Sequence, residues 1–113
     1  TRVPDLERNK AIVRRFYEEV ENKGNLDLID ELIAPDFKDV FNSSAFGPAM
    51  GRQGFRDLVE KLRQRPEFHI VIDDLIAEGD KVVLQMPRGI EVLRIVDDMI
   101  AERWVIIDRS PAG

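Results

Sequence analysis

The stretch that decides the fold is Gly89–Asp108, GIEVLRIVDDMIAERWVIID. Two runs of alternating apolar residues flank a pair of aspartates in it, and this pattern predicts a β-hairpin. A three-residue loop, Asp97–Met99, would place Leu93 opposite Arg103. Both faces of this hairpin are largely apolar, so neither can simply be left in water. We therefore expect one face to lie on helices from the first half of the chain and the other to meet a partner subunit or a ligand.

The same register sorts the charged residues of the hairpin onto its two faces. Glu91 and Arg103 lie one diagonal step apart on one face, whereas Arg94 and Glu102 oppose each other on the other face, beside Trp104. The first pair is a candidate catalytic acid/base or an anchor for a polar ligand group, because burial raises the pKa of a carboxyl group and a neighbouring arginine lowers it. A plain cross-strand ion pair is the alternative. The second pair and the tryptophan predict a dimer interface, since Trp and Arg are enriched at interfaces, or else a solvated surface pair.

The composition of the 113 residues indicates one globular domain spanning 1–113, with 43% hydrophobic and 35% charged residues. The net charge is −5 and no basic stripe is present, so we expect no nucleic-acid partner. No apolar run is long enough to span a membrane, so we expect no membrane partner and a cytoplasmic location. The chain has no cysteine and one histidine, His69, which has no acidic or histidine neighbours at ligand spacing. We therefore expect no metal site.

Helical spacing of apolar residues in the first half changes to alternation in the second half. Helices are predicted at 5–24, 25–34 and 51–65, with a short strand at 36–41 and a loop at 42–50. Strands are predicted at 68–78 and 81–86, joined by a tight turn at Gly79–Asp80 and followed by the closing hairpin. This order predicts an α+β domain in which a curved antiparallel sheet packs on three N-terminal helices.

Four segments of the sequence, in this order, resemble segments of a known protein family: IVRRFYEEVENKGNLDLIDELIAPDF, GRQGFRDLVEKLR, IDDLIAEGDKVV and IEVLRIVDDMIAERW. Over residues 9–108 the chain resembles the SnoaL-like polyketide cyclase family of the nuclear-transport-factor-2-like (NTF2-like) superfamily. The resemblance implies a cone-shaped α+β barrel, a pocket inside the cone closed by the first helix, and a homodimer through the outer sheet face. It implies less about function, because this fold hosts cyclases, isomerases, epoxide hydrolases, dehydratases and pure binding modules.

The acid/base residues of the family are mostly replaced in this chain. The aspartate that serves the cyclases as acid/base corresponds to Val105, and their pocket histidine corresponds to Glu91. The tyrosine and the aspartate base of the related ketosteroid isomerases correspond to Phe16 and Phe41, neither of which can move a proton.

The family comparison also suggests which residues line the pocket. A mostly apolar wall is expected, formed by Phe16, Val40, Leu93 and Val105, with Tyr17 packing elsewhere. Family members usually continue the strand after GDKVV into a long extension. In this chain Met86 is followed at once by the turn 87–89, so we expect a shallower or open pocket.

Three functions remain open, and none of them calls for a cofactor. The first is a domain that binds a small hydrophobic molecule in an apolar pocket, acting through Glu91 and Arg103 if it is a cyclase-, isomerase- or lyase-like enzyme. The second is a non-catalytic dimerisation or partner-binding module of the same fold, which the replaced acid/base residues favour. The third is a different enzyme, such as a dehydratase or an epoxide hydrolase, against which the lack of a visible Asp-Arg-Asp arrangement argues.

Overall fold

The helices come mainly from the first half of the chain. The computed structural model describes residues 3–41 and 49–107. The helical segments are α1 (Leu6–Arg15), which continues into the π-helix η1 (Phe16–Asn22), the short pair η2 (Leu26–Leu28) and α2 (Ile29–Leu32), and α3 (Gly51–Arg63). Asp5 caps α1 as predicted, because its Oδ1 accepts a hydrogen bond from the backbone amide of Arg8 at 3.0 Å. Among the described residues, no helix is long and apolar enough to cross a membrane.

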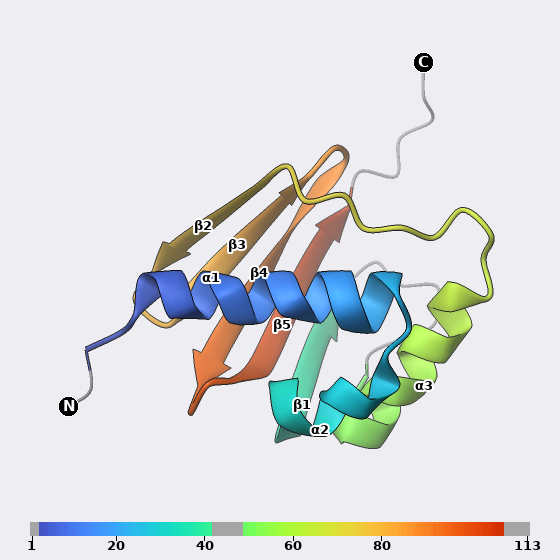
Figure 1. Ribbon diagram of the computed structural model, residues 1–113, viewed down its shortest axis with the longest axis horizontal. Coiled ribbons are helices and arrows are strands. Elements are labelled where there is room, and N and C mark those ends of the chain that lie inside the picture. Colours follow the sequence, from blue (N-terminus) through green and yellow to red (C-terminus); the bar gives the residue numbers. More distant parts are fainter. Residues whose placement is uncertain (1–2, 42–48, 108–113) are drawn as a thin grey trace.

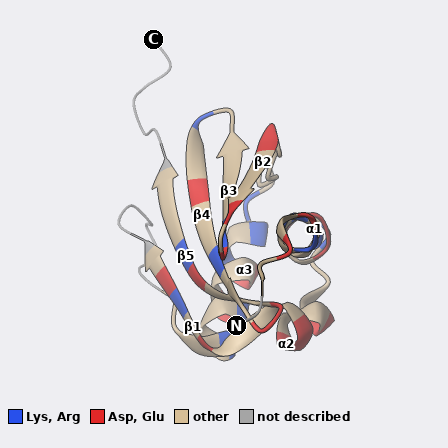
Figure 2. Cartoon of the chain, turned by 90° about the vertical axis from the view of Figure 1, so that its left-hand side faces the viewer, with Lys and Arg blue, Asp and Glu red and all other residues tan. Residues whose placement is uncertain are grey.

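Five described strands form a single sheet on which the helices pack (Figure 1). They are β1 (Ile33–Phe41), β2 (Asp74–Glu78), β3 (Lys81–Met86), β4 (Gly89–Val96) and β5 (Met99–Ile107), in the spatial order β1-β5-β4-β3-β2. Strands β2 to β5 form an antiparallel meander, and β1 pairs with β5 in parallel. The sheet curves without closing, and Figure 2, in which α1 is seen end-on, shows this helix against one face. The predicted α+β fold is confirmed, with one parallel pairing that the pattern did not predict.

The closing hairpin keeps most of the predicted register but has a different loop. Leu93 is the Cα partner of Arg103, as predicted. The turn has two residues, Asp97 and Asp98, both with positive φ (52° and 62°), and the predicted three-residue loop is wrong. Aspartate is among the few non-glycine residues that adopt this conformation, and such turns match the twist of a hairpin. A register shift just beyond Arg94 reconciles the shorter turn with the predicted pairing of the remaining residues.

The strand predicted over 68–78 is shorter in the structure, where β2 begins at Asp74. Its partner β3 ends at Met86, and the chain then turns at Pro87, which has no amide hydrogen to donate. Residues before 73 therefore have no partner on β3, and the segment 64–73 crosses from α3 to the sheet without forming a strand. Most of the loop predicted over 42–50 lies outside the described residues.

Gly24 ends the first helix as predicted, in the left-handed conformation with φ 78°. A side chain at this position would also collide with Arg63 of α3, whose Nε would lie 2.5 Å from an added Cβ. Arg63 donates hydrogen bonds to the carbonyl oxygens of Glu21 and Asn22 at 2.8 and 2.6 Å. Glycine at position 24 therefore lets α3 close on the end of η1.

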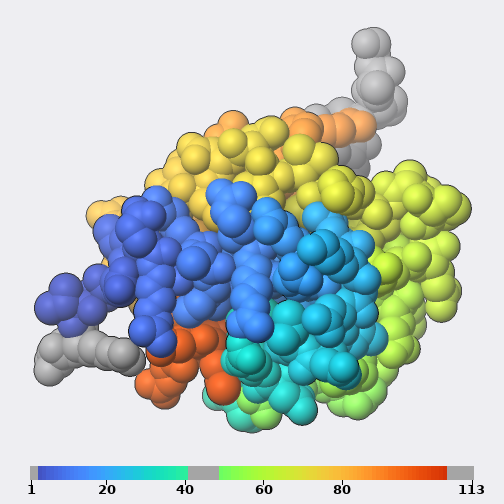
Figure 3. Space-filling model, viewed as in Figure 1, coloured from blue at the N-terminus to red at the C-terminus, as the bar shows by residue number. Residues whose placement is uncertain are grey.

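The hydrophobic core fills the space between the sheet and the helices. Its largest fully buried side chains include Tyr17, Phe16, Phe37, Phe55, Leu84, Leu93 and Ile100. In the space-filling view of Figure 3, α1 and the yellow segment that follows α3 lie side by side and cover this face. The core is therefore enclosed by helix on one side and by the sheet on the other.

Candidate functional site

A buried arginine on the inner face of the sheet gathers three carboxylates from three other elements. Arg103, on β5, is 3% exposed, and the acids are at most 4% exposed. Its Nη1 donates to Oε1 of Glu21 on η1 at 3.0 Å and to Oε1 of Glu91 on β4 at 3.1 Å. Its Nη2 donates to Oδ2 of Asp39 on β1 at 2.7 Å. We refer to these four residues as the Arg103 cluster.

Strand pairing explains how three members of the Arg103 cluster meet. Leu93 faces Arg103 across β4 and β5, so Glu91 is a diagonal neighbour on the same face, as the sequence predicts. Asp39 is the direct Cα partner of Arg103 in the parallel pair of β1 and β5. Two acids on one arginine amount to a carboxylate–Arg–carboxylate arrangement. The expectation that the chain has no such arrangement is therefore wrong. The arrangement depends on the parallel pairing of β1 with β5, which local sequence patterns do not show.

The fourth member of the cluster, Glu21, comes from the π-helix η1. Val13, Tyr17 and Glu21 are spaced by four residues, and all three are buried on the side of the helix that faces the sheet. Helical segments with i→i+5 hydrogen bonds are frequent at functional sites, and this one places Phe16 and Val20 in the core as well. Sequence reasoning missed Glu21, although an acid in line with an apolar helical stripe was a visible signal.

Tyr17 supplies a further polar contact to the cluster. Its hydroxyl donates to Oε1 of Glu91 at 2.5 Å, the same oxygen that accepts from Arg103. Burial raises the pKa of Tyr17 well above its ordinary value, with the charge of Glu91 acting in the same direction, so the hydroxyl keeps its proton. Tyr17 therefore points into the interior beside Phe16, and the expectation that it packs elsewhere is wrong.

Aromatic rings form the apolar surroundings of the arginine. The guanidinium carbon of Arg103 lies 5.4 Å from the ring centroid of Phe55 and 5.9 Å from that of Phe16. Phe16 also meets the ring of Tyr17 edge to face, with the centroids 4.8 Å apart. Rings at these distances stabilise a cation through their negative faces while excluding water.

Burial and charge together set the protonation of the cluster. Burial raises the pKa of Glu21 from 4.5 to about 7, although the charge of Arg103 opposes the shift. Burial also raises the pKa of Glu91, against the charge of Arg103 and the hydrogen bond from Tyr17. Burial alone would lower the pKa of Arg103, but the surrounding carboxylates outweigh it and hold that pKa well above its ordinary value. The guanidinium therefore stays charged.

One cation facing three acids gives the cluster an acid–base capacity. Three ionised carboxylates in a low-dielectric interior would leave excess negative charge, so a proton is held among them near neutral pH. The cluster then presents a proton donor and proton acceptors side by side. Within the described residues, three of its buried atoms have no hydrogen-bond partner: Oε2 of Glu21, Oδ1 of Asp39 and Nε of Arg103. Such atoms are costly in a core, and they are free to bind a polar group.

Of the four residues expected to line the pocket, three lie inside. Phe16, Leu93 and Val105 are buried. The expectation for Val40 is wrong, since its side chain is 45% exposed. Side chains alternate along a strand, so the inward direction of Asp39 turns Val40 to the outer face of the sheet.

The second predicted pair lies on the outer face of the same hairpin. Arg94 donates from Nε to Oε1 of Glu102 at 3.0 Å, and the two side chains are 32% and 25% exposed. Trp104 is partly buried next to this pair in sequence and on the same face. The structure thus groups the three residues predicted for an interface, on the face opposite to the Arg103 cluster.

Three surface hollows are lined by described residues, with volumes of about 390, 400 and 310 Å³. All three are lined in part by residues of α1 or of the chain just before it, and the Arg103 cluster lines none of these three. The cluster is instead enclosed by packed side chains, so a ligand reaches it only if the interior opens.

The part of the chain that the structure describes holds no group of side chains suited to a metal ion. Over 3–41 and 49–107, no group of three or more His, Asp or Glu side chains is placed to hold a metal ion. His69 is exposed on the segment 64–73.

Comparison with known proteins shows the family to which the chain belongs. The sequence pattern of the SnoaL-like polyketide cyclases matches residues 11–89, well over half of the chain. The chain belongs to the SnoaL-like polyketide cyclase family. The resemblance inferred from the four sequence phrases is thus confirmed, and membership indicates a domain that binds small molecules. A comparison with curated proteins found no match.

Solved structures similar to this SnoaL-like chain share its fold. A protein from Jannaschia sp. CCS1 named as a SnoaL-like polyketide cyclase is 19% identical, with a TM-score of 0.74 over 98% of this chain and 99% of that one. An NTF2-like protein from Mesorhizobium loti is 22% identical, with a TM-score of 0.76 over 93% and 96% of the two chains. An epoxide hydrolase of the LEH-like type from M. tuberculosis is 17% identical, with a TM-score of 0.72 over 93% and 86%. At these identities the likeness concerns the NTF2-like fold alone.

Proposed function

We propose that this domain binds a small apolar molecule beside the Arg103 cluster and moves protons on it without a cofactor. The observation that carries the proposal is one buried arginine held by three buried carboxylates, of which Glu21 has a pKa of about 7. A purely structural ion pair needs one acid, and each additional buried acid opposes folding. Buried acids whose pKa values are raised, beside a charged partner, are instead typical of acid–base sites.

Each polar residue has a role that follows from its contacts. Glu21, with a pKa near neutral pH, exchanges a proton with the substrate most readily. Glu91 is the second acid/base, held in place on one oxygen by Tyr17 and Arg103. Arg103 remains charged and stabilises negative charge that develops on a substrate oxygen.

The reaction class that fits these roles is enolisation of a small carbonyl compound. A carboxylate removes a proton from the carbon beside the carbonyl group. The electron pair of that C–H bond forms a C=C double bond, and the π pair of the C=O bond moves onto the carbonyl oxygen. If the substrate carries a C=C bond next to the carbon that loses the proton, return of the proton to the far end of the dienolate shifts the double bond and isomerises the molecule. Attack of the enolate carbon on a second carbonyl group of the same molecule closes a ring, and the new alkoxide then takes the proton. Either course regenerates the carboxylate and consumes no oxidant or reductant.

Entry of a substrate requires part of the enclosure to move, and the segment 64–73 is the candidate. This segment is held on η1 by the side chain of Asn22, which donates to the carbonyl of Ile70 at 2.9 Å and accepts from its amide at 2.7 Å. Asn22 is adjacent to Glu21 in η1. Release of these two hydrogen bonds would uncover the end of η1 that carries the acid.

The proposal can be tested without knowing the natural substrate. 2-Tetralone and cyclohexanone are incubated with the protein in D₂O, and loss of the protons beside the carbonyl is followed by ¹H NMR. We expect the protein to accelerate this exchange, and E21Q and E91Q to lower the acceleration by about 100-fold. E102Q, which removes the same charge on the outer face, should exchange like the unmodified protein. Exchange at the buffer rate with both ketones, or equal acceleration by E21Q, E91Q and E102Q, would contradict the proposal.

We further propose a homodimer through the outer face of the sheet, because a continuous row of largely apolar residues crosses all five strands there. Successive Cα partners in the sheet, from β2 to β1, are Ile76, Val83, Val92, Trp104 and Val40. Ile76 and Val40 are 52% and 45% exposed, and Ile106 on the same face is 56% exposed. An uncovered apolar surface of this kind favours burial against a second copy. If the ketone test fails, dimerisation through this row is the function that the structure still supports.

A further inference from the structure

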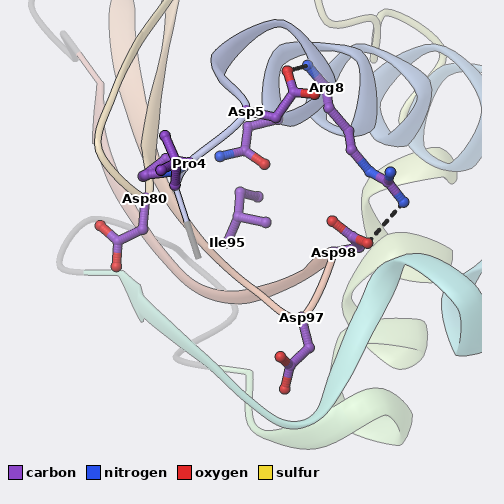
Figure 4. Close-up of a pocket in the computed structure, with 9 residues that line it drawn as sticks. Pro4, Asp5, Arg8, Asp80, Ile95, Asp97 and Asp98 are labelled. Atoms are coloured by element: carbon purple, nitrogen blue, oxygen red, sulfur yellow. Dashed lines mark hydrogen bonds and ion pairs between the residues drawn. The ribbon is translucent and has the colours of Figure 1, made fainter. Parts of the chain in front are cut away.

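A row of charged residues runs beside the apolar row that is proposed for the homodimer, on the same outer face of the sheet. It lies near the end of the sheet that carries two tight turns, whose residues Asp80, Asp97 and Asp98 are drawn in Figure 4. On each strand, its member stands two positions from the member of the apolar row, so the two rows share a face. Successive Cα partners in this charged row, from β1 to β2, are Lys38, Glu102, Arg94, Lys81 and Glu78.

The charged row is complementary to its own reverse. From β1 to β2 its charges are positive, negative, positive, positive and negative. When the row is laid over a second copy in the opposite direction, opposite charges meet at every position except the central one, where Arg94 meets Arg94. Each of these arginines is already paired with Glu102 of its own chain. Among the described residues, the exposed side chains of Lys38, Lys81 and Glu78 make no ion pair, so they are open to a partner.

One twofold axis brings the row over its own reverse. This axis runs along β4, the middle strand of the sheet, in the plane between two copies packed face to face. It exchanges the two edges of the sheet and keeps the strand direction, so Glu102 of each copy faces Lys81 of the other. A twofold axis across the strands would instead place each charge on its own copy or on apolar residues of a neighbouring row. Like charges in contact, and charges buried against apolar side chains, both oppose association.

We propose that two copies of this chain associate through their outer faces around a twofold axis along β4, and that the charged row fixes this orientation. The inference rests on the homodimer of the proposed function and adds its geometry. The same axis also matches the apolar row to itself, because Val92 then meets Val92 of the second copy and Trp104 meets Val83. An interface that combines matched apolar residues with charges that repel in other orientations selects one arrangement.

The test measures the dissociation constant of the dimer by sedimentation equilibrium in charge-reversed variants. K81E and E102K each turn two attractions into two repulsions, because the axis repeats every contact. We expect each variant to raise the dissociation constant by about tenfold or more at an ionic strength of about 10 mM, and by less at about 150 mM, where charges are screened. The double variant K81E/E102K restores opposite charges and should return to within about threefold of the unmodified protein. Circular dichroism of the same samples reports folding.

K38E/E102K is the matched control. It has the same net charge as K81E/E102K, but Lys38 and Glu102 are neighbours within one chain and do not face each other across the proposed dimer. We expect this control to associate no better than E102K. A monomeric unmodified protein would refute the homodimer and this inference with it. A dimer that tolerates K81E and E102K, or equal association of the two double variants, would leave the homodimer standing and overturn its orientation.

Discussion

The β4–β5 hairpin carries an arginine–glutamate pair on each face, and the two pairs have opposite surroundings. On the outer face, Arg94 and Glu102 meet with about a quarter to a third of each side chain exposed. On the inner face, Arg103 and Glu91 meet at 3.1 Å with side chains that are 4% and 5% exposed. The inner pair is joined by two further acids and a tyrosine. Water solvates the charges of the outer pair, whereas the charges of the inner pair are stabilised by other side chains. An arginine–glutamate pair therefore becomes part of a coupled acid–base cluster only where water is excluded.

Removal of each arginine is expected to give the largest difference in stability between the inner and the outer pair. R103M leaves three buried acids without their cation, and we expect it to lower the free energy of unfolding by about 3–5 kcal/mol at neutral pH. R94M removes the partner of a partly exposed acid and should cost about 1 kcal/mol or less. Urea unfolding followed by circular dichroism measures both. Equal destabilisation by the two variants would show that the inner pair is no more than a second surface ion pair.

The stability of the inner cluster should also depend on pH. The pKa of Glu21 is about 7 in the folded protein and about 4.5 when exposed, so the folded state binds more protons between these values. Stability from this group is present in full below about pH 4.5 and is lost as the pH rises through about 7. The loss is on the order of 3 kcal/mol, and the raised pKa of Glu91 acts in the same direction.

Urea unfolding at a series of pH values from about 5 to about 8 measures this slope. E21Q should flatten it, because glutamine cannot take up the proton. E102Q is the matched control and should leave the slope as it is. A free energy of unfolding that rises with pH over this range would contradict the assignment.

Substitution of Tyr17 tests a single hydrogen bond of the inner cluster, from the tyrosine hydroxyl to Glu91. Y17F removes the hydroxyl that donates to Glu91, and we expect a loss of about 1 kcal/mol in the free energy of unfolding. The loss should shrink when Glu91 is already glutamine, which a double-mutant cycle of Y17F and E91Q detects as a coupling energy. Additive losses would mean that the hydroxyl and the carboxylate do not interact in solution.

The smallest effect on folding is expected on the outer face. W104A should change the free energy of unfolding of the monomer by less than about 1 kcal/mol, because Trp104 is only partly buried. It should weaken self-association by about tenfold or more, since aromatic residues dominate interfaces. Sedimentation equilibrium compares the two proteins, and a monomeric unmodified protein would refute the proposed dimer.

The sequence predicted the hairpin and its inner pair because alternation along a strand is a local property. It assigned Glu91 and Arg103 to one face even though the turn is one residue shorter than expected. Asp39 was not predicted as a member of the cluster. It meets Arg103 through a parallel pairing of two residues that are 64 positions apart, and no local sequence pattern indicates such a pairing. The same pairing turned Val40 outward, against the expectation from the family.

Glu21, the helical member of the Arg103 cluster, was not predicted for a different reason. Glu21 stands in line with Val13 and Tyr17, but one acid at the end of a helix is usually solvated. Only the close approach of Arg103 makes its burial tolerable. The sequence therefore reveals the fold and half of the cluster, and the three-dimensional packing supplies the acids that change its chemistry.

The most direct test of the shared proton is a ¹³C NMR titration of the side-chain carboxyl carbon of Glu21 in the folded protein. A midpoint near pH 7 is expected, because burial in the Arg103 cluster disfavours the ionised form. In R103M, without the opposing cation, the midpoint should move higher still. A midpoint near 4.5 in the unmodified protein would contradict the account, because Glu21 would then hold no proton at neutral pH.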